Sequence, residues 1–517
     1  MGLHDFNLYH LLQHNAFVMG DAPAVIDGSA VEYNRRTLSH RQFLERVDQL
    51  AAGMTARGIG KGDRVCILAQ NSAAYLELYG ACAKTGAVAC PINWRLTASE
   101  VEAVIALADP QMLVVGAGHL SQVAGLDLRG LRVQITGAEG AQADTSAEGF
   151  IPFTDLYQDA IEEANDVRGE DPFAILPTAA VSGVPRGAVL SHHNLIMAGY
   201  MLITALGLTA RDRHWPRHLA ALPFFHITGL GLALCMMQVG GANVVMETFD
   251  PARAARWIDE YQVTLMAVFP PVLSMLLDAR NQSGAAWQSL QHVVGLDAPG
   301  TIQRLYAETQ AKFWTGFGQA ETSGVVTLTR VDAKPGSAGR TLPAVRVRCV
   351  DEAGREVPVG TPGEIAVQGP LVFAGYWRDP DATHYAFRRG WHHTGDVGKF
   401  DADGYLYYVG RKPEKELIKS GGENVYPAEV EHVIAELPEV EAVCVIGVPH
   451  EKWGEAVKAV VECKAGKTLT AEQVIAAVAG RIAAYKKPQF VEFVEKIPRQ
   501  ENGEIDRAAV KAAHGVG

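Results

Sequence analysis

Residues 173–187 read FAILPTAAVSGVPRG. The first four are apolar and predict a buried β-strand, which runs into a loop of small residues. Such a loop at the end of a strand lets backbone N–H groups approach phosphate oxygens, and the side chain of Arg186 would neutralise their charge. This segment therefore indicates a phosphate-binding loop, with an ordinary surface loop as the alternative while it stands alone.

Helix-like and strand-like segments alternate around this stretch. Residues 38–57 and 72–84 have apolar residues at helical spacing, and residues 65–68 form a short apolar run between them. From about residue 336, short strands lie between glycine and proline turns, and beyond residue 410 the pattern is α+β. This pattern predicts an α/β fold in which helices cover parallel sheets, followed by a small β-barrel or antiparallel sheet and then by an α+β segment.

The composition is that of a globular protein, with 517 residues, 48% hydrophobic and 20% charged, and a net charge of −12. The acidic balance argues against nucleic-acid binding, which needs a basic face, but permits an anionic cofactor. Seven scattered cysteines favour neither disulfides nor a zinc site and indicate a cytoplasmic protein. The longest apolar stretch, residues 227–239, is too short for a transmembrane segment, and the N-terminus does not resemble a signal peptide.

Two further segments place polar groups beside glycines. In GFGQAET (316–322), the Glu321 carboxylate could hold Mg²⁺, which commonly takes one or two carboxylates plus phosphate oxygens; a solvated loop glutamate is the alternative. After Thr-Gly at 394–395, Asp396 could accept from a ribose diol and Arg411 could donate to the same ligand, with a salt bridge in a β-turn as the alternative.

Two more segments bear on the candidate ligand site: one argues against a metal ion, and the other indicates a further ligand. The neighbouring His392 and His393 should point to opposite faces of a strand, so we expect no metal site there. In LIKSGGENVYP (417–427), Gly421 and Gly422 leave a bare backbone ahead of a helix, which suits a narrow ligand such as pantetheine.

Taken together and in this order, these segments resemble the acyl-CoA synthetase branch of the adenylate-forming enzymes. The likeness includes residues 89–96, 223–230 and 498–507 and covers about the whole chain. It implies an ATP-dependent, AMP-forming acid–CoA ligase, fatty-acid–CoA ligase-like, that forms an acyl-adenylate and then a thioester. ATP, Mg²⁺, CoA and a carboxylic acid are the implied cofactors and substrates.

The resemblance also implies a domain organisation and a set of site residues. It implies a large N-terminal domain over 1–410, of two α/β subdomains plus a small β-barrel, and a small mobile α+β domain over 417–517. A hinge at 411–416, with Glu416 as its pivot, joins the two domains. The implied nucleotide site comprises Thr178, Ser182, Gly183, Arg186, Gly187, Ala298, Pro299, Gly316, Phe317, Gly318, Ala320, Asp396 and Arg411. The implied acyl pocket comprises Phe225, His226 and Gly229, the CoA channel Lys419, Ser420, Gly421 and Gly422, and the metal and catalytic carboxylate is Glu321.

The chain departs from the family pattern at several places, among them Ala320 for a threonine and Arg186 for a lysine. Residues 179–181 read AAV where the family has Ser-Gly-Thr, which removes two hydroxyl donors. Glu504 stands where the family has a catalytic lysine between the carboxylate and the α-phosphate. Losing such an electrostatic group typically costs about 10²–10³ in rate. We therefore expect impaired adenylation, unless Arg499 or Arg507 reaches the phosphate instead.

Several alternatives stay open. A protein of the same fold could bind nucleotide or acyl-CoA without efficient ATP chemistry, and the acid could be aryl, ferulate-like, rather than a fatty acid. A luciferase-like or carrier-loading enzyme is disfavoured by residues 419–422, which suit free CoA. Small residues at 229, 231 and 233 predict either a narrow apolar pocket or tight helix packing. Lys486 and Lys487 read as a solvated pair rather than as contacts to CoA phosphates, and a homodimer is the commonest assembly.

Overall fold

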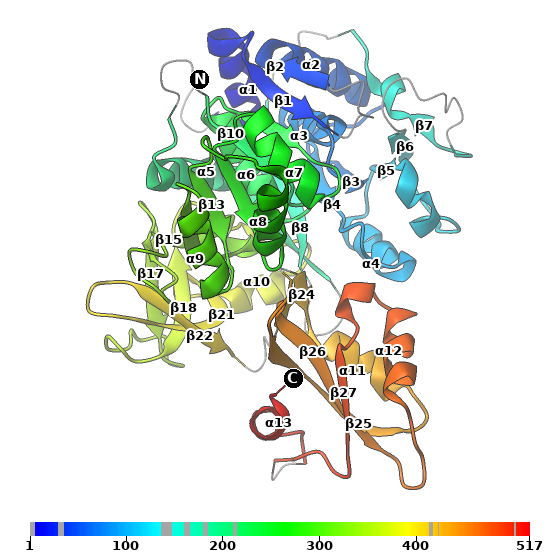
Figure 1. Cartoon of the computed structure of the whole chain (residues 1–517). Helices are drawn as coiled ribbons and strands as arrows, with labels where there is room; N and C mark the ends of the chain where they lie inside the picture. Colours follow the sequence, from blue (N-terminus) through cyan, green and yellow to red (C-terminus); the bar gives the residue numbers. More distant parts are fainter. Residues whose placement is uncertain are drawn as a thin grey trace.

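The computed structural model describes residues 6–28, 36–135, 147–159, 166–178, 185–209, 215–412, 417–421, 423–500 and 503–516. Most of the chain forms a large N-terminal domain, and the segment from residue 417 onward forms a smaller domain below it in Figure 1. The expected class, α/β with a large N-terminal and a small C-terminal domain, is confirmed.

The phosphate-loop strand belongs to the first sheet. In spatial order its strands are β19 (Gly375–Tyr376), β9 (Arg186–Ser191), β8 (Pro172–Thr178), β4 (Val88–Pro91), β3 (Arg64–Leu68), β5 (Met112–Gly116), β6 (Leu131–Ile135) and β7 (Ile151–Pro152). Strands β8, β4, β3, β5, β6 and β7 are parallel, whereas β9 folds back antiparallel on β8. Because β8 and β9 pair up to Thr178 and Arg186, both ends of the small-residue loop are fixed at the same end of these two strands.

The second sheet supplies the opposite wall of the domain. Its order is β16 (Arg340–Thr341), β15 (Gly324–Arg330), β14 (Lys312–Gln319), β13 (His292–Gly295), β12 (Leu265–Val268), β10 (Arg217–Ala220), β11 (Ala242–Val245), β1 (Pro23–Asp27) and β2 (Arg36–Ser39). The central strands are parallel and the edge strands β2, β15 and β16 are antiparallel.

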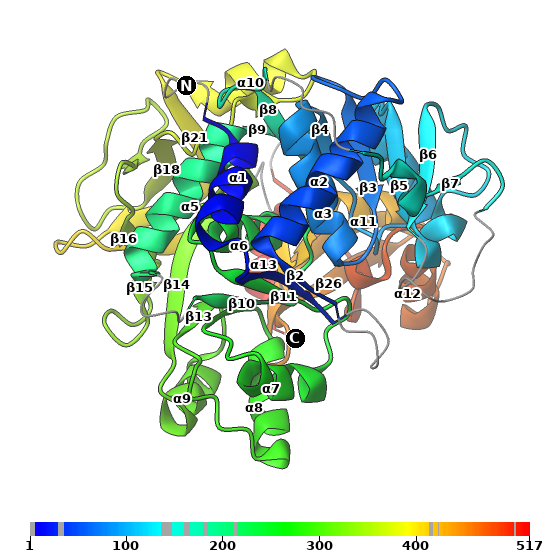
Figure 2. The ribbon, with the colours of Figure 1, turned by 90° about the horizontal axis from the view of Figure 1, so that it is seen from above.

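Helices fill the space between these sheets and cover their outer faces. They are α1 (Leu8–Met19), α2 (His40–Thr55), α3 (Ala73–Thr85), α4 (Ala98–Ala108), α5 (His192–Leu206), α6 (Ile227–Gln238), α7 (Pro251–Glu260), α8 (Val272–Ser283), α9 (Pro299–Glu308) and α10 (Pro380–Ala386). Figure 2 shows α1, α2, α3, α5 and α6 between the strands of the two sheets. They form a continuous apolar core there, with Val47, Tyr79, Leu195 and Leu230 as buried members.

Local sequence explains where such helices begin and end. The Ser72 hydroxyl accepts from the Tyr75 N–H, which caps the start of α3, and Gly86 ends the helix with a φ of +75°. The apolar stretch from residue 227 is α6, whose residues pack in the core. Within the described ranges, the structure contains no helix long and apolar enough to cross a membrane.

A third, antiparallel sheet stands where the small β-barrel is expected. It consists of β17 (Arg346–Val350), β18 (Gly363–Gln368), β20 (Phe387–Arg388), β21 (Trp391–Phe400) and β22 (Leu406–Arg411). Strand β21 brings Asp396 opposite Arg411 on β22. This pairing connects the third sheet to the site described below.

The C-terminal domain is an α+β unit, as the sequence predicts. Its elements are β23 (Ile418–Ser420), β24 (Glu423–Val425), α11 (Pro427–Ala435), β25 (Val440–His450), β26 (Gly454–Cys463), α12 (Ala471–Ala479), β27 (Phe490–Val494) and α13 (Arg507–His514). The helix expected over residues 471–484 is shorter and ends before Gly480. Side chains from both faces of β25 and β26 form the core of this domain.

Candidate functional site

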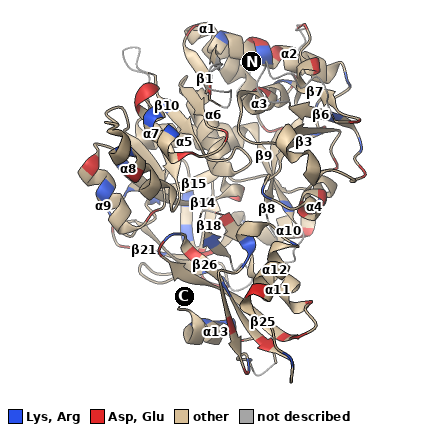
Figure 3. Ribbon diagram, turned by 45° about the vertical axis from the view of Figure 1, so that its right-hand side comes forward, with Lys and Arg blue, Asp and Glu red and all other residues tan. Residues whose placement is uncertain are grey.

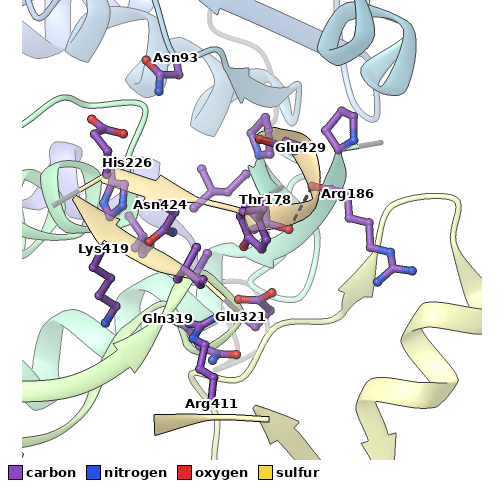
Figure 4. A pocket seen from close by; sticks show the side chains of 18 of the residues that line it. Asn93, Thr178, Arg186, His226, Gln319, Glu321, Arg411, Lys419, Asn424 and Glu429 are labelled. Carbon is purple, nitrogen blue, oxygen red and sulfur yellow. Dashed lines mark hydrogen bonds between the residues drawn. The ribbon is translucent and has the colours of Figure 1, made fainter. Parts of the chain in front are cut away.

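A cavity of about 1690 Å³ lies where the three sheets of the N-terminal domain meet the C-terminal domain. It is lined by the predicted residues Thr178, Arg186, Phe225, His226, Gly316, Gly318, Ala320, Glu321, Arg411 and Lys419. Figure 4 shows His226, Asn424 and Lys419 on one side of this cavity and Arg186 on the other, with Thr178 and Glu321 between them. The structure therefore brings together segments that are more than 200 residues apart in sequence.

At one end of the cavity, basic and acidic groups meet beside the ends of the phosphate-loop strands. The Arg186 guanidinium lies 3.1 Å from the Asp379 carboxylate and 5.7 Å from the centre of the Tyr376 ring. The Tyr376 hydroxyl donates to Glu321 at 2.9 Å. Burial and the Glu321 charge raise the pKa of Tyr376, so the phenol stays protonated as a donor. This end offers one cation, one carboxylate and the Thr178 hydroxyl to a ligand.

The same end fits a magnesium ion that takes some of its ligands from a bound phosphate. Among the described residues, no group of three or more His, Cys, Asp or Glu side chains could hold a metal ion by itself. Mg²⁺ commonly binds through one or two carboxylates plus phosphate oxygens, so Glu321, which lines the same cavity as Thr178 and Arg186, meets its requirement.

A second group of residues lies beside Arg411. Asp396 is 2% exposed, and its carboxylate is 2.8 Å from Arg411 Nε. Tyr408 donates to the same carboxylate at 3.2 Å, and the Tyr408 ring stacks on Phe317 at 6.2 Å. The aspartate and the arginine lie opposite each other on the paired strands β21 and β22, so the salt bridge between them is present, and the ribose contact stays a prediction.

The third part of the cavity surrounds His226, the N-cap of α6. Its ring accepts from the Thr228 N–H at 3.3 Å, and burial lowers the pKa of His226, so the ring is neutral near pH 7. The Arg95 guanidinium lies 5.9 Å from the centre of the Phe225 ring and forms an ion pair with Glu423 of the C-terminal domain. Both charged residues lie within motifs of the family resemblance, but their pairing is not predicted from the sequence.

The hairpin of β23 and β24 closes the cavity from the C-terminal domain. At its tip, Gly421 has a φ of +58°, and a Cβ atom there would lie 2.8 Å from the Trp453 ring. The Gly421 N–H also donates to the Trp453 carbonyl at 3.0 Å. Glycine is therefore required both by the backbone and by the tryptophan, which lines the cavity and is not predicted from the sequence.

Other predicted residues do not line this cavity. Gly187, Gly229, Ala298, Pro299, Phe317, Asp396, Ser420, Gly421 and Glu504 are outside its lining, although Asp396 and Phe317 contact residues that belong to it. A Cβ atom on Gly229 would lie 2.1 Å from the Pro223 carbonyl oxygen, so the structure favours helix packing for this glycine. The predicted Ser182, Gly183, Glu416 and Gly422 lie outside the described residues.

In this arrangement Glu504 of the C-terminal motif lies outside the cavity lining, whereas Arg507 belongs to it. Glu504 is exposed on a turn whose Gln500 N–H donates to the Glu504 carbonyl at 2.7 Å. Arg499 donates to the Gly503 carbonyl at 3.1 Å, and Arg507 lies 2.7 Å from Glu431 within its own domain. The hairpin of residues 418–425, rather than Glu504, therefore faces the cavity.

The expectation that Lys486 is solvated is wrong. Its ammonium group lies 2.6 Å from Glu100 of the N-terminal domain and 2.7 Å from Glu429 of the C-terminal domain, and the residue is 5% exposed. The Ala483 N–H also donates to Glu100, at 3.0 Å. We name these residues the Lys486 cluster; it joins the two domains at the rim of the cavity.

A buried carboxylate contacts the start of the predicted hinge, at the end of β22. Glu364 lies 3.0 Å from His393 and 2.9 Å from Lys412. The neighbouring His392 instead contacts Gln319, so the two histidines serve different partners. Burial by itself would raise the pKa of Glu364, but the hydrogen bonds and charges of His393 and Lys412 outweigh it and lower the pKa to about 2.

This lowered pKa predicts acid sensitivity. A carboxyl group whose folded pKa lies below its ordinary value of 4.5 stabilises the fold fully above that pH, and this stabilisation is lost as the pH falls toward 2. Its size is on the order of 3 kcal/mol. We expect the free energy of unfolding in urea to fall between pH 6 and pH 3.5, and to fall less in Glu364→Gln. The exposed Glu102→Gln control should follow the wild type; an unchanged pH slope in Glu364→Gln would contradict the prediction.

Fold and cavity together define a two-domain α/β enzyme of the adenylate-forming class. The chain belongs to the AMP-binding enzyme family, whose model matches residues 12–377, and the model of the AMP-binding enzyme C-terminal domain matches residues 429–504. The predicted resemblance is confirmed, and the chain is an enzyme of the AMP-forming acid–CoA ligase family.

Individual relatives are named for different substrates. The feruloyl-CoA synthase of an Amycolatopsis species is 34% identical over 94% of this chain and 96% of its own length. The long-chain-fatty-acid–CoA ligase FadD13 of Mycobacterium tuberculosis is 32% identical over 92% of each chain. A crystal structure of a putative long-chain-fatty-acid CoA ligase from Rhodopseudomonas palustris is 43% identical, with a TM-score of 0.72, over 79% of this chain and all of that one.

Proposed function

We propose that this protein is an ATP-dependent ligase that joins an apolar carboxylic acid, in the first instance a fatty acid, to CoA through an acyl-adenylate. The observation that carries the proposal is a single cavity shared by Arg186, Glu321, Arg411 and the hairpin of residues 418–425. Adenylation places a good leaving group on an inert carboxylate, and both the nucleotide and a pantetheine thiol must reach that carbon. A cavity bordered by both domains supports this sequence of steps.

Each part of the cavity then has a chemical task. Arg186 and the loop after Thr178 would bind phosphate oxygens, and Mg²⁺ on Glu321 would neutralise charge on the departing pyrophosphate. Asp396 and Arg411 would hold the ribose beside the Phe317 and Tyr408 rings. These roles follow from the family resemblance together with the contacts described above.

The apolar part of the cavity supports an apolar acid. Phe225 and Ile227 flank His226 at the start of α6, and Phe269 and Val294 complete this side. An aryl acid is the second candidate, because the feruloyl-CoA synthase is also a close relative by sequence identity. A CoA-channel role for Lys419 through Gly422, a cytoplasmic location, a homodimer and a pivot at Glu416 belong to the same proposal.

A direct assay tests the function. The full chain is incubated with ATP, Mg²⁺, CoA and equimolar fatty and aryl-propenoic acids, and thioesters are identified by mass. We expect an acyl-CoA product, and Glu321→Gln should lower its rate by about 10²–10³. Detection of AMP and CoA binding by calorimetry without any thioester or pyrophosphate would instead favour a nucleotide-binding protein without efficient ATP chemistry.

A further inference from the structure

Behind the cavity wall, a hydrogen-bond chain runs from His392 through Gln319 to Asp396. His392 Nε2 lies 2.9 Å from Gln319 Oε1, and Gln319 Nε2 donates to Asp396 Oδ2 at 3.0 Å. Gln319 ends β14 of the second sheet and lines the cavity beside Arg411 and Glu321, as Figure 4 shows. The other two residues lie four positions apart on β21. These hydrogen bonds thus connect the second sheet with the third.

The chemistry of the two acceptors fixes the direction of every hydrogen bond. The Asp396 carboxylate and the Thr394 carbonyl can only accept, so the nitrogen of the Gln319 amide must face them. The amide oxygen therefore faces His392, which must donate from Nε2. Reversing the amide would put its oxygen against a carboxylate, so the two acceptors fix the orientation of the glutamine, and a proton on His392 Nε2 is the donor that fits this orientation.

The packing holds the histidine in place. His392 is 1% exposed, and its ring lies 5.2 Å from the Phe373 ring and 5.8 Å from the Phe387 ring. Asp396 Oδ1 already faces Arg411 and Tyr408, so the Gln319 amide contacts the other carboxylate oxygen. Both oxygens of this aspartate are therefore oriented by neighbouring groups before any ligand arrives.

We propose that His392 and Gln319 are positioning residues that fix the Asp396 carboxylate for the ribose hydroxyls of the nucleotide, with His392 acting only through Gln319. This inference rests on the proposed function, because it takes Asp396 as the ribose acceptor. A preoriented acceptor binds a diol with less loss of side-chain freedom. These hydrogen bonds therefore raise the affinity for the sugar rather than the affinity for the phosphates.

The test compares two ligands that differ only at the sugar. Affinities of the full-length chain for AMP and for 2′,3′-dideoxy-AMP are measured by calorimetry in the wild type, His392→Phe and Gln319→Met. We expect the wild type to prefer AMP and both variants to lose about tenfold in AMP affinity, with little change for the dideoxy ligand. In the Gln319→Met background, His392→Phe should add nothing. His292→Phe removes a histidine that accepts from Trp314 outside the cavity lining and should bind both ligands as the wild type does.

The outcomes separate this inference from the function on which it rests. A wild type that binds no AMP, or binds both ligands equally, overturns the ribose site and the inference with it. Variants that lose affinity equally for both ligands, or retain the full preference for AMP, overturn the inference alone. If phenylalanine disturbs the fold, His392→Asn keeps an N–H donor in a smaller side chain; it should then retain more of the AMP preference than Gln319→Met, and an equal loss counts against the inference.

Discussion

Lys486→Met is expected to slow thioester formation far more than adenylation. The substitution keeps a long unbranched side chain but leaves Glu100 and Glu429 facing each other across the domain boundary without a cation. Removing one partner of a buried ion pair typically destabilises the interaction by about 3–5 kcal/mol. Figure 3 shows the acidic positions on α4 and α11, the helices that carry these two carboxylates.

The domain arrangement explains why one step should be affected. Here the hairpin of residues 418–425 and Trp453 line the cavity, whereas Glu504 is outside its lining. We infer that this arrangement serves the step in which a pantetheine thiol enters. Glu100 is the member of the Lys486 cluster that belongs to the N-terminal domain. Loss of the Lys486 ammonium group would therefore disfavour this arrangement relative to one in which the small domain has turned.

The measurement follows the two half-reactions separately. Pyrophosphate release reports adenylation, and acyl-CoA formed from preformed acyl-adenylate reports the second step. Lys487→Met is the matched control, because Lys487 is the adjacent, exposed lysine and should behave as the wild type does. Equal losses in both steps, or no loss in either, would show that the Lys486 cluster does not favour this arrangement.

The sequence predicts best those features that depend on neighbouring residues. The alternation of apolar runs predicts β3, α3 and the strand before the phosphate loop, because period and capping are local properties. The shared cavity is predicted through the family resemblance rather than from any one segment. No local pattern would have identified Arg186, Glu321 and Arg411 as neighbours.

What the sequence does not predict are contacts between distant segments. Lys486 looks like a solvated lysine because its two carboxylate partners come from α4 and α11, far away in the chain. The pairing of Arg95 with Glu423 is hidden for the same reason. Gly229 shows the opposite error: its size is explained by the nearby Pro223 carbonyl and not by a ligand.

Glu504→Lys is expected to raise pyrophosphate release by about 10²–10³, because it restores a cation where the family uses one against charge developing at the α-phosphate. The acyl-CoA step from preformed acyl-adenylate should stay unchanged, since the exposed Glu504 lies outside the cavity lining in the arrangement assigned to that step.

Glu495→Lys introduces the same charge at another exposed position of the C-terminal domain and separates a local effect from a change in net charge. It should leave both half-reactions as they are in the wild type. If Glu504→Lys and the wild type released pyrophosphate equally fast, the glutamate would not be a handicap. The α-phosphate would then need a different cation, and Arg507, which borders the cavity, could supply it by leaving Glu431 when the small domain turns. Arg507→Ala would in that case abolish adenylation, whereas it should change adenylation little if Glu504 is the limiting group.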